Sequence, residues 1–353
     1  MKNKIYKTIT YFIGFILIAI IGYVLFMIIT DYKPEKEVSI EIQNNQNNLV
    51  ENNESLSVTT FNTGYCGTDK DIDFFMDGGT QSRSISKERT IENLNGIIYE
   101  MKTLNSDVYF LQEVDKKATR SYKVNQFEDY QNSFKNYSSS FAINYKVPWV
   151  PLPITKPHGQ VLAGLTTLSN IQLNSSTRYD LPGKESFFRQ LGDLDRCILV
   201  NRASTSDGKE LVLINVHLSA YDKGGTIRKQ QLEFLKTVLK DEYEKGNYVV
   251  VGGDWNQQIP GTDYKNFETT QEKPDWLQDI PKDFAPKGFT WATDENMPTC
   301  RTMDIVYTKG VNLLSIIDGF LVSDNIDVTS VKSTNLEFKN TDHNPVTIEF
   351  KLK

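Results

Sequence analysis

Several short apolar runs of this chain end in acids, amides and imidazoles, the side chains that bind metal ions and move protons. These runs read LSVTTFN, DVYFLQE, ELVLINVH and NYVVVGGDWN, and a last polar cluster reads TDHNPV. Carboxylate and amide oxygens suit hard cations such as Mg²⁺ or Mn²⁺, whereas an imidazole can carry a proton near neutral pH. Two of the 3 histidines lie in these clusters. The candidate residues are Asn62, Glu113, His217, Asp254, Asn256, Asp304, Asp342 and His343.

Each candidate also has an ordinary structural explanation when it is taken alone. Glu113 could be an exposed loop acid, Asp304 could belong to a surface ion pair, and His217 could be a hydrogen-bonded core histidine. The segment 254–256 could be a turn capped by its own side chains, and His343 could cap a proline turn. Because all of them follow or precede strand-like runs, their coexistence favours a site.

Other site classes lack their signatures in this sequence. The histidines have no H-x-x-x-H spacing and the cysteines are not paired, which disfavours zinc. The G-x-S-x-G elbow of serine hydrolases is absent, as are the P-loop and the G-x-G-x-x-G fingerprint. The 3 cysteines are far apart, so we expect free buried thiols, with one disulfide pair as the alternative. They are Cys66, Cys197 and Cys300.

Alternating strand and helix patterns must position these residues. Apolar residues recur at helical spacing in residues 86–105, behind a cap at Ser86 or Ser84. They recur again in residues 226–246, where the pattern stops near Gly246. The run Val249–Val251 is apolar on both faces, as in a strand covered on both sides. The alternation predicts a layered α/β or α+β domain, with a site where polar strand ends meet.

The first thirty residues predict a membrane anchor. Residues 9–29 carry no charge, and as a helix they would be about 31 Å long, enough to cross a bilayer. Lysines precede the run, so we expect a cytoplasmic tip at residues 1–8 and a transmembrane anchor at residues 9–30. The protein would be a single-pass cell-membrane protein, and the remainder of the chain would lie outside the cell. A cleavable signal peptide is the alternative, but the run is long and no Ala-x-Ala site follows it.

The chain beyond the anchor divides once by composition. Residues 31–55 are rich in Asn, Gln and Glu and predict a flexible tether, although VSIEI within it allows a short strand. Residues 56–353 show no further break and predict one domain. The formal net charge is -6, and removing the three lysines before the anchor leaves -9. This acidity argues against broad binding to a nucleic-acid backbone.

In their order along the chain, the clusters FNTGY, LQEVD, NVHLSA, GGDWNQ, MDIVYT and TDHNPV resemble the endonuclease/exonuclease/phosphatase superfamily. Deoxyribonucleases, abasic-site endonucleases, sphingomyelinases and inositol-polyphosphate 5-phosphatases belong to it. The resemblance spans about residues 56–353. It implies a four-layer sandwich of two packed mixed β-sheets flanked by helices, with the site at one end. It also implies a Mg²⁺-dependent hydrolase of phosphate esters, with Mn²⁺ as the alternative ion.

The resemblance assigns metal and phosphate contacts to the acids and amides. Glu113 is expected to be the principal Mg²⁺ ligand, with Asn62 beside it. Asp342 is expected on the metal-phosphate side. Asp254 and Asn256 are expected to orient the nucleophile and to grip the phosphate or the metal.

The resemblance also assigns roles to the imidazoles. His343 is expected to be the general base or a phosphate-side imidazole, held by Asp304. His217 is expected to be the second imidazole, which stabilises the transition state or helps the leaving oxygen. Arg189 and Arg196 are candidate phosphate clamps, because arginine suits bidentate phosphate contacts; solvated arginines are the alternative.

The sequence leaves the substrate open. A phosphodiesterase acting on a lipid, a small phosphodiester or a nucleic acid fits, and an acidic domain suits the first two at least as well as duplex DNA. The named alternatives are an extracellular nuclease, a sphingomyelinase-like or phosphoinositide-phosphatase-like lipid phosphoesterase, and an inactive binding module. The bilayer is the expected partner of residues 9–30, and no obligate protein partner is evident. The proline-rich segment around Trp149 predicts a substrate-facing loop or a rigid crossover.

Overall fold

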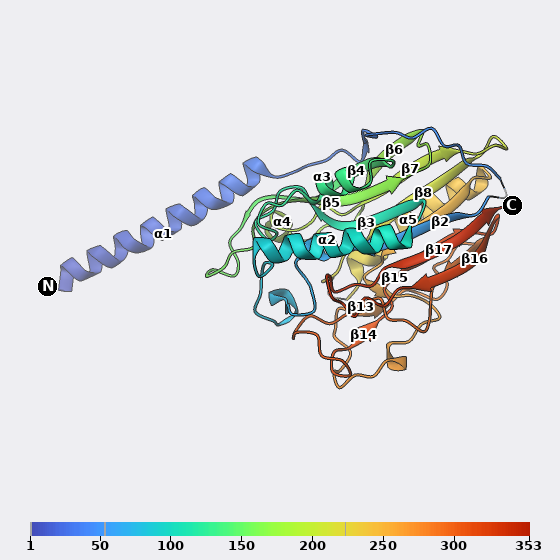
Figure 1. Ribbon diagram of the computed structural model, residues 1–353. Helices are drawn as coiled ribbons and strands as arrows, with labels where there is room; N and C mark the ends of the chain where they lie inside the picture. Colours follow the sequence, from blue (N-terminus) through green and yellow to red (C-terminus); the bar gives the residue numbers. More distant parts are fainter. Residues whose placement is uncertain (1, 53, 223) are drawn as a thin grey trace.

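Short β-branched runs form two mixed sheets in the computed structural model, which describes residues 2–52, 54–222 and 224–353 (Figure 1). Residue 1 of the predicted tip and residue 53 of the predicted tether lie outside the described residues. The first sheet contains, in spatial order, β1 (Glu37–Ser39), β6 (Ser175–Asp180), β7 (Cys197–Ser204), β8 (Glu210–His217), β9 (Tyr248–Asp254), β15 (Asp318–Ser323) and β12 (Phe289–Ala292). The second contains β16 (Ile326–Ser333), β17 (Val346–Leu352), β2 (Leu56–Asn62), β3 (Val108–Asp115), β5 (Gly159–Ser169) and β4 (Ser138–Val150).

Helices and short elements complete the domain. The helices are α1 (Lys2–Thr30), α2 (Lys87–Leu104), α3 (Gln126–Ser133), α4 (Phe187–Gln190) and α5 (Thr226–Glu244). Single 3-10 turns are η1 (Gly64–Cys66), η2 (Phe75–Asp77) and η3 (Tyr264–Asn266). Two small strand pairs are β10 (Gln257–Gln258) with β11 (Gln278–Asp279), and β13 (Cys300–Arg301) with β14 (Leu314–Ser315).

The core lies in the layers between and outside the sheets. Val250 of β9 packs between the sheets, in a cluster with Phe110 of β3 and Phe320 of β15. Its neighbours Val249 and Val251 belong to a second cluster, with side chains of α5 on the outer face. Successive strand residues point to opposite faces, so both faces of β9 are covered. This arrangement confirms the predicted sandwich of two mixed sheets with flanking helices.

The predicted helices begin and end at the expected signals. Ser86 Oγ accepts a hydrogen bond from Arg89 N at the start of α2, and the helix ends at Asn105, which has left-handed backbone angles. Helix α5 ends shortly before Gly246, whose φ is +78°. Helices α2 and α3 share a buried cluster with the outer face of the second sheet. The helices therefore hold both sheets in place from outside.

Parallel pairing brings the polar strand ends to one end of the sandwich. Strands β2 and β3 are parallel neighbours, as are β8 and β9, where His217 lies opposite Asp254. Strand β15 runs antiparallel to β9, so its first residue, Asp318, also lies opposite Asp254. The ends of four strands and the start of a fifth therefore meet at one place.

Parts of residues 31–52 pack on the domain, which corrects the prediction of a flexible tether for this segment. The short strand suggested by VSIEI is present as β1, which adds to the edge strand β6. Gln43 forms an isolated bridge with Ser139 of the other sheet's edge strand. Val50 is buried among core side chains. Unpaired backbone groups at sheet edges offer partners to a passing extended segment, which composition alone does not reveal.

Helix α1 projects from the domain and is apolar over most of its length (Figure 1). An 18-residue stretch within residues 3–30 has a mean hydropathy of 3.0, and by length and composition the helix could cross a membrane, although a signal sequence has the same properties. Near its end, Met27 is buried, and Tyr23 Oη donates a hydrogen bond of 2.9 Å to the carbonyl oxygen of Trp149 in β4. The last turns of α1 therefore lie against the domain.

Candidate active site

Asp254 lies at the centre of the polar strand ends. Its Oδ2 accepts a hydrogen bond of 3.0 Å from Asn62 Nδ2 and lies 3.4 Å from His217 Nε2 and 3.9 Å from His343 Nε2. Asn62 Nδ2 lies 3.5 Å from Glu113 Oε1. Residues far apart in the sequence, from β2, β3, β8, β9 and the approach to β17, are thus brought together.

His343 is held by Asp318 and not by Asp304, so the predicted partner of this imidazole is wrong. His343 Nδ1 lies 2.8 Å from Asp318 Oδ2, whereas both carboxylate oxygens of Asp304 accept from Gln271 Nε2 at 2.9 Å. Asp304 instead borders a neighbouring cavity, together with Asp77. Strand β13 ends at Arg301, so Asp304 does not lie on a strand. The antiparallel start of β15 places Asp318, rather than Asp304, beside the His343 ring.

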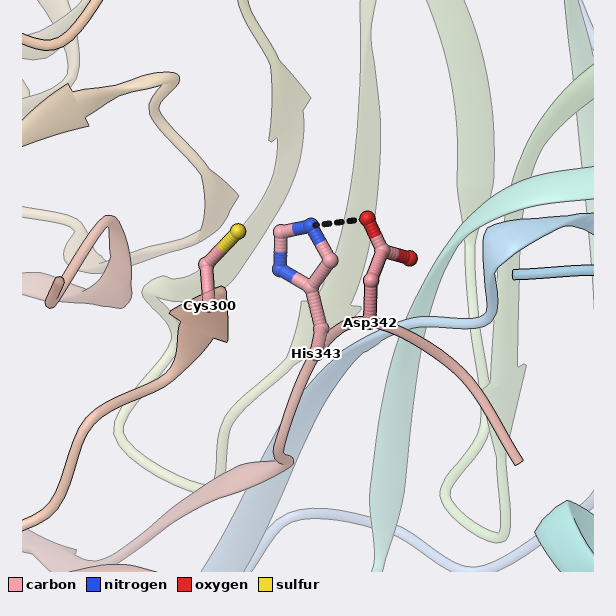
Figure 2. Close-up of side chains that lie close together, drawn as sticks. All are labelled: Cys300, Asp342 and His343. Carbon is pink, nitrogen blue, oxygen red and sulfur yellow. Dashed lines mark ion pairs between the residues drawn. The ribbon is translucent and has the colours of Figure 1, made fainter. Parts of the chain in front are cut away.

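Strand β13 holds the TDHN segment in position beside the site (Figure 2). Arg301 N donates to the carbonyl of Asp342, and Cys300 and His343 form an isolated β-bridge. Figure 2 shows the Asp342 carboxylate on one side of the imidazole, with Oδ2 at 3.8 Å from His343 Nε2, and Cys300 on the other. Asp342 Oδ1 accepts a hydrogen bond of 2.6 Å from Thr68 Oγ1. The carboxylate is therefore fixed next to the ring.

Two site residues have left-handed backbone angles, which few non-glycine residues adopt. Glu113 has φ of +57° and Asn256 has φ of +50°. The pairing of β3 with β5 shifts register between Leu111 and Val114, so Glu113 sits at a bulge. Such conformations cost of order 1–3 kcal/mol and cluster at functional sites. The left-handed backbone angles therefore support a functional role for both side chains.

The site acid Asp254 also organises the turn that follows it. Asn256 N donates a hydrogen bond of 2.8 Å to Asp254 Oδ1, and Asn256 Nδ2 donates at 2.8 Å to the carbonyl of Leu218, just after β8. The capped turn and the site therefore coexist, because the same carboxylate serves both.

Three arginines surround the acids in different ways. Arg120, which the sequence did not single out, lies 2.9 Å from Asp115 and 3.7 Å from Glu113. Arg196 lines the cavity, and its Nη1 donates to the carbonyl of His217 at 3.4 Å. Arg189 also lines the cavity, but it is half exposed. Arg196 is the deeper of the two predicted clamps.

Burial separates the protonation behaviour of the two imidazoles. Burial lowers the pKa of His217 well below its usual value, and nearby Arg196 adds to this effect. Burial also acts to lower the pKa of His343, but the Asp318 carboxylate outweighs it and holds that pKa well above its usual value. At neutral pH His217 is therefore neutral, whereas His343 carries its proton.

Burial also disfavours the charged forms of two site acids. It raises the pKa of Glu113, although Arg120 opposes the shift. It raises the pKa of Asp254 as well, and the Asp318 carboxylate adds to that rise. Crowded, desolvated carboxylates of this kind are the setting in which a cation binds.

The donor set fits a hard divalent cation. Carboxylates of Glu113 and Asp342 line the cavity, and oxygen ligands are those that Mg²⁺ and Mn²⁺ prefer. Asn62 lies beside Glu113 and turns its Nδ2 toward the acids, while its Oδ1 accepts a hydrogen bond from Gly64 N. Asp254, Asp318 and His343 also offer ligand atoms within 4.8 Å of one another. The cysteines Cys66, Cys197 and Cys300 are free and buried, as expected.

The site opens into a cavity of about 410 Å³ with a polar floor and an apolar wall. The floor carries Glu113, Asp254, His217, Asp342 and His343. The wall includes Phe74, Phe75, Met76, Val150 and Leu152. Such a cavity can receive a phosphate ester whose neighbouring group is apolar.

Comparison with known proteins agrees with this geometry. Residues 93–324 match the Endonuclease/Exonuclease/phosphatase family. No curated protein matches the sequence. An endonuclease/exonuclease/phosphatase from Beutenbergia cavernae has a TM-score of 0.60 at 16% identity, over 84% of this chain and 72% of that one.

Two further solved structures share the fold. The human Nocturnin catalytic domain has a TM-score of 0.53 at 16% identity, over 89% of this chain and 97% of that one. ANGEL2, a 2',3'-cyclic phosphatase solved with adenosine-2',3'-vanadate, has a TM-score of 0.54 at 15% identity, over 89% of this chain and 99% of that one. At these identities the likeness establishes the fold.

Proposed function

We propose, for a chain that belongs to the Endonuclease/Exonuclease/phosphatase family, that it is a divalent-metal-dependent phosphodiesterase anchored to a membrane by α1. The observation that carries the proposal is the convergence of Glu113, His217, Asp254 and His343 on one cavity floor, with Asn62 in contact with Glu113 and Asp254 behind it. An inactive binding module would have no need to keep these groups together in strained and desolvated positions.

Asp254 and His343 divide the proton chemistry between them. The raised pKa of Asp254 makes its carboxylate a better acceptor for the proton of an attacking water. His343, held by Asp318 at 2.8 Å, presents a charged Nε2–H to a non-bridging phosphate oxygen. Of the two roles expected for His343, the phosphate-side imidazole is therefore the one that its pKa supports.

The remaining groups bind the phosphate and the cation. Glu113, Asn62 and Asp342 would hold Mg²⁺ or Mn²⁺, which supplies positive charge for the developing phosphorane. Neutral His217 would hydrogen-bond a phosphate oxygen without competing for that charge. Arg196 lines the same cavity and would meet the phosphate from the other side.

One assay tests the proposal. The purified full chain is incubated with bis-p-nitrophenyl phosphate, and in parallel with DNA, RNA, sphingomyelin and phosphoinositides, in Mg²⁺, Mn²⁺ or EDTA. We expect metal-dependent hydrolysis that Asp254→Asn reduces by at least about 100-fold. Absence of cleavage of every substrate, under conditions where the metal binds, would contradict an enzymatic role. DNA or RNA cleavage alone would select the nuclease alternative.

The anchor is tested separately. If α1 spans a membrane with its amino terminus in the cytoplasm, the full chain should resist extraction by alkaline carbonate, and external protease should digest the domain in intact cells. Release by carbonate, or a mature chain that begins after residue 30, would select the signal-peptide alternative.

A further inference from the structure

Exposed apolar side chains gather on two segments that border the mouth of the cavity. Trp149, Leu152 and Ile154 lie where β4 leads into β5, and Phe187 and Phe188 lie on α4. Their exposed fractions run from 40% for Trp149 to 84% for Ile154. We call these five residues the apolar rim. Val150, Leu152, Arg189 and Gln190 of the same two segments line the cavity, so the rim lies beside it on both segments.

Large exposed apolar groups gathered in this way mark a surface that water does not normally face. Phe187 and Phe188 pack edge to face at 5.3 Å between ring centroids, yet both remain more than half exposed. Ile154 is still more exposed and packs even less against the core of the domain. The rim therefore needs an outside partner of apolar chemistry.

The rim is continuous with the apolar helix α1. Tyr23 Oη donates to the carbonyl oxygen of Trp149, a rim residue, at 2.9 Å, and Met27 is buried against the domain. Tyr23 precedes the end of α1 by about seven residues, which corresponds to about 10 Å along the helix axis. Figure 1 shows the connection between β4 and β5 at the end of the domain from which α1 projects. The rim thus lies at the level of residues that a membrane would cover.

We propose that the apolar rim inserts into the outer surface of the bilayer that α1 spans, and that the substrate is a lipid phosphodiester. Tryptophan at the water–lipid boundary and phenylalanine below it are typical of such contacts. The cavity mouth then opens onto the headgroup layer. This inference rests on the proposed function and deepens it by naming the substrate class.

The cavity has the polarity that a lipid headgroup requires. Its floor offers His217, His343 and Arg196 to the phosphate, while Phe74 and Leu152 on the wall face the first apolar carbons of the lipid. Water adds to phosphorus, and the ester bond to the lipid alcohol breaks. The leaving oxygen takes up one proton, which gives a phosphomonoester and a free alcohol.

The first experiment measures the position of the rim without using activity. The full chain is reconstituted in phosphatidylcholine vesicles that contain a lipid with a nitroxide near the top of its acyl chain. We expect strong quenching of tryptophan fluorescence, and we expect Trp149→Phe to remove at least half of the quenched signal. Trp149 is the tryptophan of the rim, whereas Trp255 is buried and Trp276 and Trp291 pack against core clusters. Equal quenching in both proteins would overturn the insertion of the rim.

The second experiment compares a soluble with a membrane substrate. Wild type, Phe187→Ser/Phe188→Ser and Ile154→Ser are assayed on bis-p-nitrophenyl phosphate and on vesicles of phosphatidylcholine, phosphatidylglycerol and sphingomyelin. We expect each rim variant to lose at least tenfold on the vesicles and to keep soluble turnover. Tyr99→Ser, at a side chain 67% exposed on α2, is the matched control and should change neither rate.

The outcomes separate the two levels of the proposal. Soluble hydrolysis with no lipid cleavage, or with equal vesicle rates in all variants, would overturn the lipid substrate while the phosphodiesterase stands. No hydrolysis of either substrate would overturn the phosphodiesterase, and the quenching result then judges the rim alone. If the rim instead binds a second copy of the chain, rim variants will change the oligomeric state and quenching will not depend on Trp149.

Discussion

At the scale of single residues, two acids compete for the role of holding His343. Asp318 pairs with its Nδ1 at 2.8 Å, whereas Asp304 pairs with Gln271. A carboxylate on the far ring nitrogen fixes the tautomer and stabilises the imidazolium. Asp318 is nearly fully buried, so its charge acts on the ring without screening by water. The distinction gives a direct test.

We expect Asp318→Asn to lower turnover of bis-p-nitrophenyl phosphate by about 100-fold, within the range of proton-transfer effects. An asparagine keeps the shape of the aspartate side chain, but it has no negative charge, and only one of its two terminal atoms can accept a hydrogen bond. Asp304→Asn is the matched control, because it removes the charge of the acid that the sequence favoured, and it should change turnover less than threefold, by roughly the scatter of a surface change. The reverse order of effects would restore Asp304 to the site.

The sequence predicted most of the strand ends but not all of the site. Asn62, Glu113, His217 and Asp254 end parallel strands, and this pattern is visible as an apolar run followed by a polar residue. Asp318 begins an antiparallel strand, so its polar residue precedes the run and resembles any loop acid. The left-handed φ of Glu113 arises from the bulge between β3 and β5. A bulge depends on pairing, which one strand's sequence does not contain.

At the scale of elements, the segment before β2 belongs to the folded domain. Val50 is only 1% exposed and packs in the cluster between the sheets, while its neighbour Leu49 is 60% exposed. We expect Val50→Ala to lower the free energy of unfolding by about 2 kcal/mol, because buried methyl groups are lost. Leu49→Ala should change it by less than about 0.5 kcal/mol. Denaturant unfolding of the full chain in detergent measures both, and equal small effects would restore the flexible tether.

Two loops beside the site are joined by a buried histidine. His158 Nδ1 lies 2.9 Å from the carbonyl oxygen of Ser82, and its ring stacks on Tyr145 at 6.3 Å between centroids. Burial lowers the pKa of His158 from 6.5 to about 3, and the nearby Arg120 adds to the shift. The ring is therefore neutral in the folded chain, and Nδ1–H can donate to the Ser82 carbonyl.

This depressed pKa makes stability depend on pH. Between pH 6.5 and about 3 the unfolded chain binds a proton on His158 and the folded chain does not. The contribution of neutral His158 to the free energy of unfolding is therefore fully present above pH 6.5. It falls as the pH drops below that value, by at most about 1.4 kcal/mol per pH unit. His158→Gln keeps a hydrogen-bond donor for the Ser82 carbonyl. Between pH 6.5 and 5 it should reduce the slope of the free energy of unfolding against pH by the amount that corresponds to about one bound proton. An unchanged slope would place the effect elsewhere, for instance at His217.

At the scale of the whole molecule, the net charge of -6 and the crowded acids at one end oppose folding by charge repulsion, which a bound cation would reduce. The carboxylates of Glu113, Asp254, Asp318 and Asp342 lie close together at the site. The charged His343 lies beside the three aspartates, and Arg120 lies beside Glu113, so the four acids are only partly compensated. Binding to the folded chain alone stabilises it in proportion to the logarithm of the ion concentration. The ion should therefore raise the unfolding temperature.

We expect Mg²⁺ at about 100 times its Kd to add about 2.7 kcal/mol to the free energy of unfolding, which raises Tm by several degrees, and EDTA to reverse the change. Glu113→Gln should abolish the increase while raising the metal-free Tm, because it removes one of the mutually repelling acids. Glu337→Gln, at an exposed acid of the loop before His343, is the control and should respond to Mg²⁺ as wild type does. Differential scanning calorimetry of the full chain in detergent measures these shifts. An equal Mg²⁺ response in Glu113→Gln would show that Glu113 does not hold the ion.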